Sequence, residues 1–383
     1  MSQDNASMAG LRVVAVEHFI ASPYCTQLLA DQGAEVIKVE SPDAVHSGYF
    51  PTLNRNKRSI ALDLKSAEGL EALSALIRTA DVFVTNLAPG APARMGFDYE
   101  RLAAINPRLI YVQITGFGLN SPYRNIPAFD GVIQAMSGMM DLTGEPDGPP
   151  MLSGLFVPDH LTGLWAALAV SNAVLRRNRT EQGAFIDLSM LDCVMSFLSS
   201  AFSEVLLEGS TLTRIGSKVR GSYASTYRAS DGYVYLAPLT ARMWRGVAEV
   251  VARPELLSFM GDGPDSDIRL AHRDKLDAVI EGWTSQHPVA EVVARMRAVG
   301  VASSAVHTMA EVVVDPHLEA RNMLRAIPDG SGDRYYVPGS PIPAVDDSFS
   351  VAPPKVGEHT DEILAELGLT PAGVADTAGR RDG

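Results

Sequence analysis

The first half of the chain alternates short β-branched runs with helical segments, and this alternation limits the fold more than any other feature. Predicted strands lie at residues 12–16, 35–40, 81–85, 109–115 and 184–188. Predicted helices lie at residues 23–31, 67–79, 99–105, 161–177 and 189–208. Strands separated by helices of this length form βαβ units, whose strands run parallel. We therefore predict an α/β fold with a largely parallel, doubly wound sheet.

The amino-acid composition changes in the second half of the chain, which predicts a second, smaller α/β domain. A length of 383 residues allows two or three domains. Residues 1–208 are expected to belong to the large domain, and residues 209–232, rich in Gly, Ser, Thr and Tyr, to form a linker. A strand followed by mostly helical sequence predicts the small domain at 233–305, which leaves 306–383 as a C-terminal segment.

The charge balance argues against nucleic acid and membrane surfaces as partners. The chain has 32 Lys and Arg against 45 Asp and Glu, a formal net charge of −13. Nucleic acids and anionic membranes are bound by cationic surfaces, so neither partner is expected. The longest apolar stretch, 161–175, is interrupted by polar residues and is too short to span a bilayer.

Cysteine and histidine usage predicts neither a disulfide framework nor a metal site. The two cysteines, Cys25 and Cys193, fit a reducing cytoplasm. The N-terminus lacks the basic and apolar regions of a signal peptide, so a cytoplasmic location is expected. No two of the eight histidines are spaced as metal ligands on one predicted helix face, so no metal is predicted.

The loop after the first strand excludes the usual dinucleotide site. It reads EHFIASPYC and contains no glycine, so a pyrophosphate has no G-x-G-x-x-G motif through which to approach the backbone. Glu40, at the end of the second strand, would otherwise suit a ribose. Nicotinamide and flavin cofactors are therefore disfavoured. The sequence also lacks a phosphate-binding P-loop, a zinc-binding H-E-x-x-H and a hydrolase G-x-S-x-G.

Two segments offer candidate anion-binding residues. The basic cluster Arg55, Lys57 and Arg58 is either a solvated loop or a phosphate-binding group, since Arg and Lys both bind phosphate. The segment 86–90 follows the predicted strand 81–85 and precedes Arg94. Loops after the carboxyl ends of parallel strands bind ligands in α/β sheets, which favours a functional role for this segment.

Asp159 stands immediately before the long apolar helix. Its position after Pro158 predicts a helix N-cap, where its side chain would satisfy free backbone N–H groups. A carboxylate at a helix N-terminus is also favoured in its ionised form and can attack an acyl carbon. The two interpretations are compatible.

Taken in order, the motifs of the chain resemble the class III CoA-transferases, a family that also contains the α-methylacyl-CoA racemases. The matching segments are GAEVIKVE (33–40), NKRSIALDLK (56–65), ADVFVTNLAPGAPARMGFDYERL (80–102), NPRLIYVQITGFG (106–118), FDGVIQAMSG (129–138), VPDHLTG (157–163), DLSMLD (187–192), DPHLEAR (315–321) and GEHTDEILAELG (357–368). Each motif alone is weak, but their order and spacing over nearly the whole chain are specific.

The resemblance implies a fold, a substrate and a set of site residues. The implied fold is a Rossmann-like large domain, completed by the C-terminal segment, with a small domain between, in a homodimer of two interlocked chains. It implies acyl-CoA and carboxylic acids as substrates, no tightly bound cofactor, and Asp159 as the catalytic residue. The implied CoA-contacting positions are Ile20, Ala21, Leu62, Lys65, Asn86, Leu87, Ala88, Arg94, Met95, Phe129 and Asp130.

Two departures from the family pattern concern the phosphates of CoA. Ser41 and Pro127 occupy positions that are basic in the formyl-CoA transferases. We therefore consider Arg55, Lys57 and Arg58 as substitute phosphate contacts.

Three functions compete for such a chain. In a CoA-transferase, Asp159 would attack the thioester and form a mixed anhydride and then an aspartyl-CoA thioester. A racemase needs two acid–base groups on opposite faces of the substrate, and the position of the racemase histidine holds Phe129, which transfers no proton. His160 is a poor replacement because adjacent residues on a helix do not face each other. An acyl-CoA-binding scaffold without activity is disfavoured because Asp159 and its flanking residues are intact.

Overall fold

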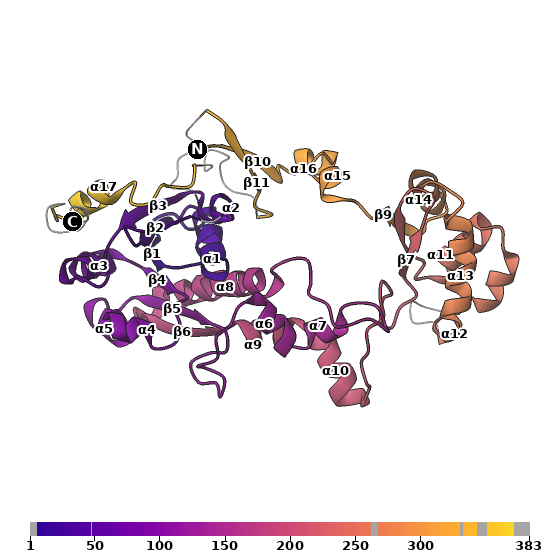
Figure 1. The fold of residues 1–383 in the computed structure, drawn as a ribbon, viewed down its shortest axis with the longest axis horizontal. Coiled ribbons are helices and arrows are strands. Elements are labelled where there is room, and N and C mark those ends of the chain that lie inside the picture. Colours follow the sequence, from indigo (N-terminus) through magenta and orange to yellow (C-terminus); the bar gives the residue numbers. More distant parts are fainter. Residues whose placement is uncertain (1–5, 47, 262–266, 330–331, 343–350, 371–383) are drawn as a thin grey trace, which may run out of the picture. The chain divides into compact units, whose positions relative to one another are not determined.

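The structure is a computed structural model that describes residues 6–46, 48–261, 267–329, 332–342 and 351–370. The chain divides into two compact units (Figure 1). Unit 1 consists of Met1–Met139, Ser153–Glu208 and Pro316–Gly383. Unit 2 consists of Met140–Leu152 and Gly209–Asp315.

Unit 1 is built on a six-stranded parallel sheet with the strand order β3-β2-β1-β4-β5-β6. The strands are β1 (Arg12–Val16), β2 (Glu35–Glu40), β3 (Lys57–Ala61), β4 (Val82–Thr85), β5 (Ile110–Thr115) and β6 (Ala184–Ser189). The central strands are almost entirely buried, as expected for a parallel sheet covered on both faces. The predicted α/β fold with a parallel sheet is confirmed.

Helices cover both faces of this sheet (Figure 1). The helices of unit 1 are α1 (Ala21–Ala30), α2 (Phe50–Asn54), α3 (Ala67–Thr79), α4 (Ala91–Met95), α5 (Tyr99–Ile105), α6 (Asp130–Met136), α8 (Val157–Thr180), α9 (Met190–Phe197), α10 (Ser199–Glu208), α16 (Pro316–Ala320) and α17 (Thr360–Glu366), with α7 (Met139–Leu142) at the boundary. One core joins α1, α6, α8 and α9 to the sheet, and the other joins α3, α5 and α17 to its opposite face. Unit 1 also contains an antiparallel hairpin of β10 (Leu324–Pro328) and β11 (Arg334–Pro338).

The edge strand β3 was not predicted, because its polar residues are typical of a loop. Its outer side is covered by the segment that leads into α17. The backbone N–H of Ser59 donates to Nδ1 of His359 at 3.2 Å, and the N–H of His359 returns a bond to the Ser59 carbonyl at 2.9 Å. The N–H of Ala61 donates to Thr360 Oγ1 at 3.0 Å. These bonds satisfy backbone groups that an edge strand would otherwise expose.

The predicted helix 189–208 is two helices, α9 and α10, which bend by 68°. Within the part of the chain that the structure describes, no single helix has both the length and the apolarity of a membrane span, although this bent pair meets both criteria when joined. The cytoplasmic location stays a prediction.

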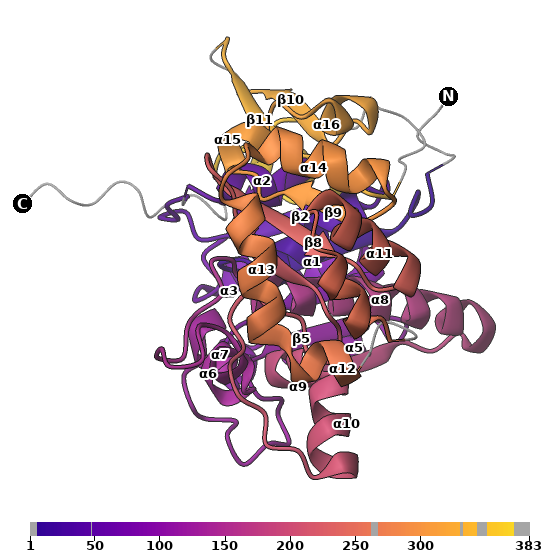
Figure 2. The same cartoon turned by 90° about the vertical axis from the view of Figure 1, so that its right-hand side faces the viewer.

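Unit 2 has a three-stranded antiparallel sheet of β7 (Ser225–Arg228), β8 (Tyr233–Ala237) and β9 (Ala302–Ala305). Its helices are α11 (Ala241–Val250), the 3-10 helix η2 (Pro254–Phe259), α12 (Asp267–Ala271), α13 (Arg273–Thr284), α14 (Val289–Ala298) and α15 (Met309–Val312). Figure 2 shows α11, α13 and α14 beside β8 and β9. Their side chains pack with the sheet around the buried Trp244.

The domain boundaries differ from the predicted ones. The segment 209–232, predicted as a linker, contains β7 and therefore belongs to unit 2, because β7 pairs with β8. Unit 2 also extends to Asp315 instead of 305 and includes Met140–Leu152, which the sequence analysis placed in the large domain.

Candidate active site

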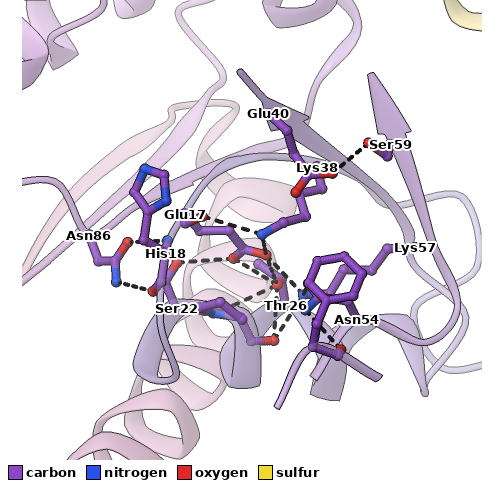
Figure 3. Close-up of polar contacts among 12 residues, drawn as sticks. Glu17, His18, Ser22, Thr26, Lys38, Glu40, Asn54, Lys57, Ser59 and Asn86 are labelled. Atoms are coloured by element: carbon purple, nitrogen blue, oxygen red, sulfur yellow. Dashed lines mark hydrogen bonds and ion pairs between the residues drawn. The ribbon is translucent and has the colours of Figure 1, made fainter. Parts of the chain in front are cut away.

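The site forms where the order of the strands reverses. From β1 the chain continues to β2 and β3 on one side, whereas β4, β5 and β6 lie on the other. His18 follows β1 and Asn86 follows β4, and two hydrogen bonds join them (Figure 3). A crevice at the carboxyl ends of such strands is the usual binding place in open α/β sheets.

A cavity of about 610 Å³, the main cavity, opens at this point and lies wholly within unit 1. Eight of the predicted site residues line it: Ile20, Ala21, Asn86, Leu87, Ala88, Phe129, Asp130 and Asp159. They come from the loops after β1 and β4, the start of α6 and the start of α8. The structure therefore brings together residues that are up to 139 positions apart in the sequence (159 minus 20).

A second cavity of about 410 Å³ lies next to the first, and His18 and Leu87 line both. Three further predicted residues, Leu62, Lys65 and Met95, line this second cavity. Arg94 lines neither cavity. It is exposed at the end of α4, with its guanidinium turned towards Gly90.

Asp159 is the third residue of α8 and not its N-cap, which is Phe156. The N-cap prediction is wrong because Pro158 occupies the second helical position, where the lack of an N–H costs no hydrogen bond. Burial raises the pKa of the Asp159 carboxyl, and the nearby Asp130 carboxyl raises it further, to about 7. Burial and Asp130 thus raise the pKa of Asp159 by more than the helix N-terminus, which favours the ionised form, lowers it.

Asp130 joins the starts of two helices. It is the first residue of α6, and its Oδ2 accepts a hydrogen bond from the backbone N–H of Asp159 at 3.3 Å. Its Oδ1 accepts from Nε2 of Gln134 at 2.6 Å. Phe129, just before it, is 61 % exposed and packs edge to face against Phe19, with 5.5 Å between ring centres. The side chain at position 129 is thus aromatic and transfers no proton.

The basic cluster is engaged inside the fold. Arg55 Nη2 lies 2.6 Å from Asp31 Oδ2, and Arg58 pairs with Glu35 at 2.6 Å and with Glu366 at 2.7 Å. Because these cations have carboxylate partners and line neither the main nor the second cavity, we do not retain them as phosphate contacts.

The third cation of the cluster, Lys57, is completely buried. Its ammonium donates to Glu17 Oε1 at 2.9 Å, the Pro23 carbonyl at 3.0 Å and Asn54 Oδ1 at 3.0 Å (Figure 3). These acceptors use all three of its donors. Although burial alone would raise the pKa of Glu17, Lys57 and Lys38 lower it to about 2. The group is an internal ion pair, so Lys57 is also withdrawn as a phosphate contact.

Two basic residues that line the main cavity, His18 and Arg124, were not predicted from the sequence. Burial and the nearby Lys38 lower the pKa of His18, which favours the neutral imidazole. The place of His18 immediately after a buried strand could have marked it. Arg124 lies in an irregular loop with no local pattern to mark it.

His160 does not face the main cavity. It lines a separate cavity of about 190 Å³, where its ring packs against Tyr24 at 4.8 Å between centres. Its Nδ1 lies 2.7 Å from the Phe156 carbonyl oxygen. Among the described residues, no group of three or more His, Cys, Asp or Glu side chains is arranged to hold a metal ion.

Comparison with known proteins decides the family. The sequence pattern of CoA-transferase family III matches residues 8–360. The chain belongs to this family. The predicted family and its enzyme class are confirmed, and the protein is a CoA-transferase.

Several members of the family resemble the chain over almost its whole length. It is 33 % identical to succinyl-CoA:mesaconate CoA-transferase of Haloarcula marismortui (94 % of this chain, 96 % of the relative). It is 31 % identical to succinate–glutarate CoA-transferase of Agrobacterium fabrum (94 % and 95 %) and 33 % identical to formyl-CoA:oxalate CoA-transferase of Streptomyces avermitilis (95 % and 96 %). A crystal structure of a CAIB/BAIF family protein from Brucella suis superposes with a TM-score of 0.84 at 34 % identity, covering 95 % of this chain and 100 % of that one.

Proposed function

We propose that this CoA-transferase moves CoA from an acyl-CoA donor to a carboxylic acid, with Asp159 as the nucleophile. The observation that carries the proposal is the partly buried Asp159 carboxyl on the wall of the main cavity, at the sheet's switch point. A carboxylate in this position can reach a thioester bound in the cavity.

The proposed reaction exchanges thioester and anhydride bonds. An Asp159 oxygen attacks the thioester carbonyl carbon, the C–S bond breaks, and a mixed anhydride and the CoA thiolate result. The thiolate attacks the aspartyl carbonyl, which releases the first acid and leaves an aspartyl-CoA thioester. A second carboxylate attacks that thioester, forming a new anhydride and CoA thiolate. Attack of the thiolate on the new acyl carbon yields the product and restores Asp159.

The environment of Asp159 suits this chemistry. Activated acyl groups are lost to hydrolysis in water, and the walls of the main cavity are largely apolar, including Ile20, Phe129 and Phe156. A carboxyl with a pKa of about 7 is ionised in a substantial fraction at neutral pH and can attack.

The two adjoining cavities suit the two ends of CoA. We place the thioester in the main cavity beside Asp159 and the nucleotide end in the second cavity. Lys65 is exposed and lines the second cavity together with the carboxyls of Glu40, Asp43 and Asp63, and its ammonium supplies a positive charge for the phosphates. Leu87 and His18 line both cavities and would lie along the chain that joins the two ends.

The relatives indicate the class of acid. Their names include succinate, mesaconate, glutarate and oxalate, which are dicarboxylic acids, and formyl as the one monocarboxylic acyl group. We propose that the acid handled here is dicarboxylic as well. Racemisation is the weaker alternative, because Phe129 stands at the position of the racemase histidine, His160 lines another cavity, and the relatives are named CoA-transferases. A racemase would have to use His18, which lines the main cavity with Asp159.

A homodimer is part of the proposal. Helix α8 exposes Leu164, Trp165, Leu168 and Leu175, and α10 has no buried residue in the single chain. Apolar surface of this extent is typical of a protein–protein interface.

The experiment combines CoA exchange with trapping of the intermediate. The enzyme is incubated with succinyl-CoA and a panel of dicarboxylic acids, and CoA thioesters are followed by mass spectrometry. In the absence of acceptor, hydroxylamine should convert the Asp159 adduct into a hydroxamate that peptide mapping locates. Asp159→Ala should abolish exchange and adduct, whereas His160→Ala, the matched neighbour, should retain both. An adduct on another residue, or exchange by Asp159→Ala at a rate within about tenfold of the unmodified enzyme, would refute the assignment.

A further inference from the structure

Arg124 brings a permanent positive charge to the main cavity. It lies in the loop between β5 and α6, and it is the one Lys or Arg among the described residues that line this cavity. The other charged groups of the lining are the carboxyls of Asp130 and Asp159. Within the described part of the chain, the guanidinium of Arg124 has no hydrogen bond or ion pair, so it is free to bind an anion.

The position of Arg124 does not suit the phosphates of CoA. All negative charges of CoA lie in its nucleotide half, whereas the pantetheine arm and the thioester are uncharged. Under the proposed function the nucleotide end occupies the second cavity, which Arg124 does not line. Arg124, an exposed cation that lines the cavity with Asp159, therefore serves the acid and not the nucleotide.

A dicarboxylic acid carries a second carboxylate, which can pair with the guanidinium of Arg124. One carboxylate reacts at Asp159 and becomes an uncharged anhydride or thioester. The second stays ionised inside a largely apolar cavity, where an unpaired charge is strongly disfavoured. The planar guanidinium of arginine binds a carboxylate through two parallel hydrogen bonds.

We propose that Arg124 binds the non-reacting carboxylate of the dicarboxylic acid and thereby selects dicarboxylic over monocarboxylic acids. The inference rests on the proposed function and adds to it the residue that recognises the substrate class.

The test compares two acceptors of equal length, 13C-labelled succinate and the monoamide succinamate, with the same unlabelled succinyl-CoA donor. The label separates the succinyl-CoA formed from succinate from the donor itself. Any effect of a variant on the donor cancels in the ratio of the two kcat/KM values. In the unmodified enzyme this ratio should favour succinate. Arg124→Gln should lower the ratio by about 10- to 100-fold, the loss expected for a hydrogen-bonded charge pair. Arg124→Lys keeps the positive charge but loses the two parallel N–H donors of the guanidinium, so it should retain part of the preference for succinate.

The control is Arg179→Gln, at the exposed C-terminal end of α8 and about 30 Å along that helix from Asp159. It should leave the ratio unchanged. An unchanged ratio in Arg124→Gln, or a rise in KM for succinyl-CoA without a change of ratio, overturns the inference and leaves the proposed function standing. Failure of the unmodified enzyme to transfer CoA to either acid, with no adduct on Asp159, counts against the proposed function itself.

Discussion

His18 and Asn86 close the switch point of the sheet with two reciprocal hydrogen bonds. The backbone N–H of His18 donates to Asn86 Oδ1 at 2.9 Å, and Asn86 Nδ2 donates to the His18 carbonyl at 2.7 Å. One side chain thus fixes the loop after β1 against the loop after β4. Both loops line the main cavity, so the geometry of the site depends on this link.

Asn86→Ala removes both bonds. We expect the free energy of unfolding to fall by about 1–3 kcal/mol, at about 0.5–1.5 kcal/mol for each hydrogen bond. We also expect KM for the acyl-CoA to rise, because the two loops separate. Urea unfolding and initial rates measure the two effects.

Asn106→Ala is the matched control for Asn86→Ala. The Asn106 side chain donates to the carbonyls of Ile77 and Ala80 and accepts from the backbone N–H of Arg108, but it lines neither cavity. It should lose similar stability and keep its KM. An equal rise of KM in both variants would show that general loosening, not the His18–Asn86 link, is responsible.

The pH profile should follow the ionisation of Asp159. Its pKa is raised to about 7, so the attacking carboxylate is lost as the pH falls through that value. We expect kcat/KM to rise with pH around a midpoint near 7. Asp130→Asn should move the midpoint to lower pH, because it removes the repelling charge while burial remains.

Measurements of kcat/KM from pH 5 to 9 would test this assignment. Asp361→Asn, an exposed carboxyl at the start of α17, serves as the control with an unchanged profile. If Asp130→Asn does not shift the midpoint of the kcat/KM profile, the titrating group is not Asp159.

The buried pair of Lys57 and Glu17 should contribute to stability. Lys57→Met removes the nearer counter-charge of the buried Glu17 carboxylate and leaves it Lys38 at 3.5 Å, so it should lower the free energy of unfolding by about 3–5 kcal/mol. The double variant with Glu17→Gln should be less destabilised than the sum of the single variants. Thermal unfolding provides the comparison.

Arg58→Gln separates the structural from the phosphate-binding interpretation of the basic cluster. Arg58 pairs with carboxylates on α17 at the partly exposed edge of the sheet, so its loss should cost only about 0–1 kcal/mol and leave KM for acyl-CoA unchanged. A KM that rises severalfold would return the cluster to the phosphate-binding role we have withdrawn.

The exposed face of α8 predicts a dimer. Sedimentation should give a mass of about 82 kDa, twice the 41.0 kDa of the chain. Trp165→Glu together with Leu168→Glu places two charges on this face and should yield monomers or insoluble protein. Arg179→Gln, at the end of the same helix, should leave the mass unchanged. A mass near 41 kDa for the unmodified chain contradicts the prediction.

The sequence predicted correctly those strands whose own residues form an apolar, β-branched run. The β-branched runs of β1, β2 and β4 marked them as strands, because strands buried on both faces read as continuous apolar segments. Strand β3 escaped because two of its five residues are cationic. Lys57 is tolerated there only because Glu17, 40 residues earlier, supplies its counter-charge, and no local pattern shows that.

The candidate site was predictable to a similar degree. The order of the motifs led to Asp159 and to seven of the residues that line the main cavity with it. Neither its raised pKa nor the role of Arg124 was accessible, since both depend on which side chains share a cavity after folding. The expected phosphate role of Arg55 failed for the same reason, because Asp31 reaches it across the fold.

The cover over the edge strand has a consequence for synthesis of the chain. Ser59 of β3 and His359, which hydrogen-bonds to its backbone, are 300 positions apart. At about 5–20 residues per second, β3 leaves the ribosome roughly 15 to 60 s before its cover exists. During that interval the strand presents an open edge to neighbouring nascent chains. Arg58, whose carboxylate partners on α17 are not yet made, then places a charge on that edge and opposes strand pairing between chains.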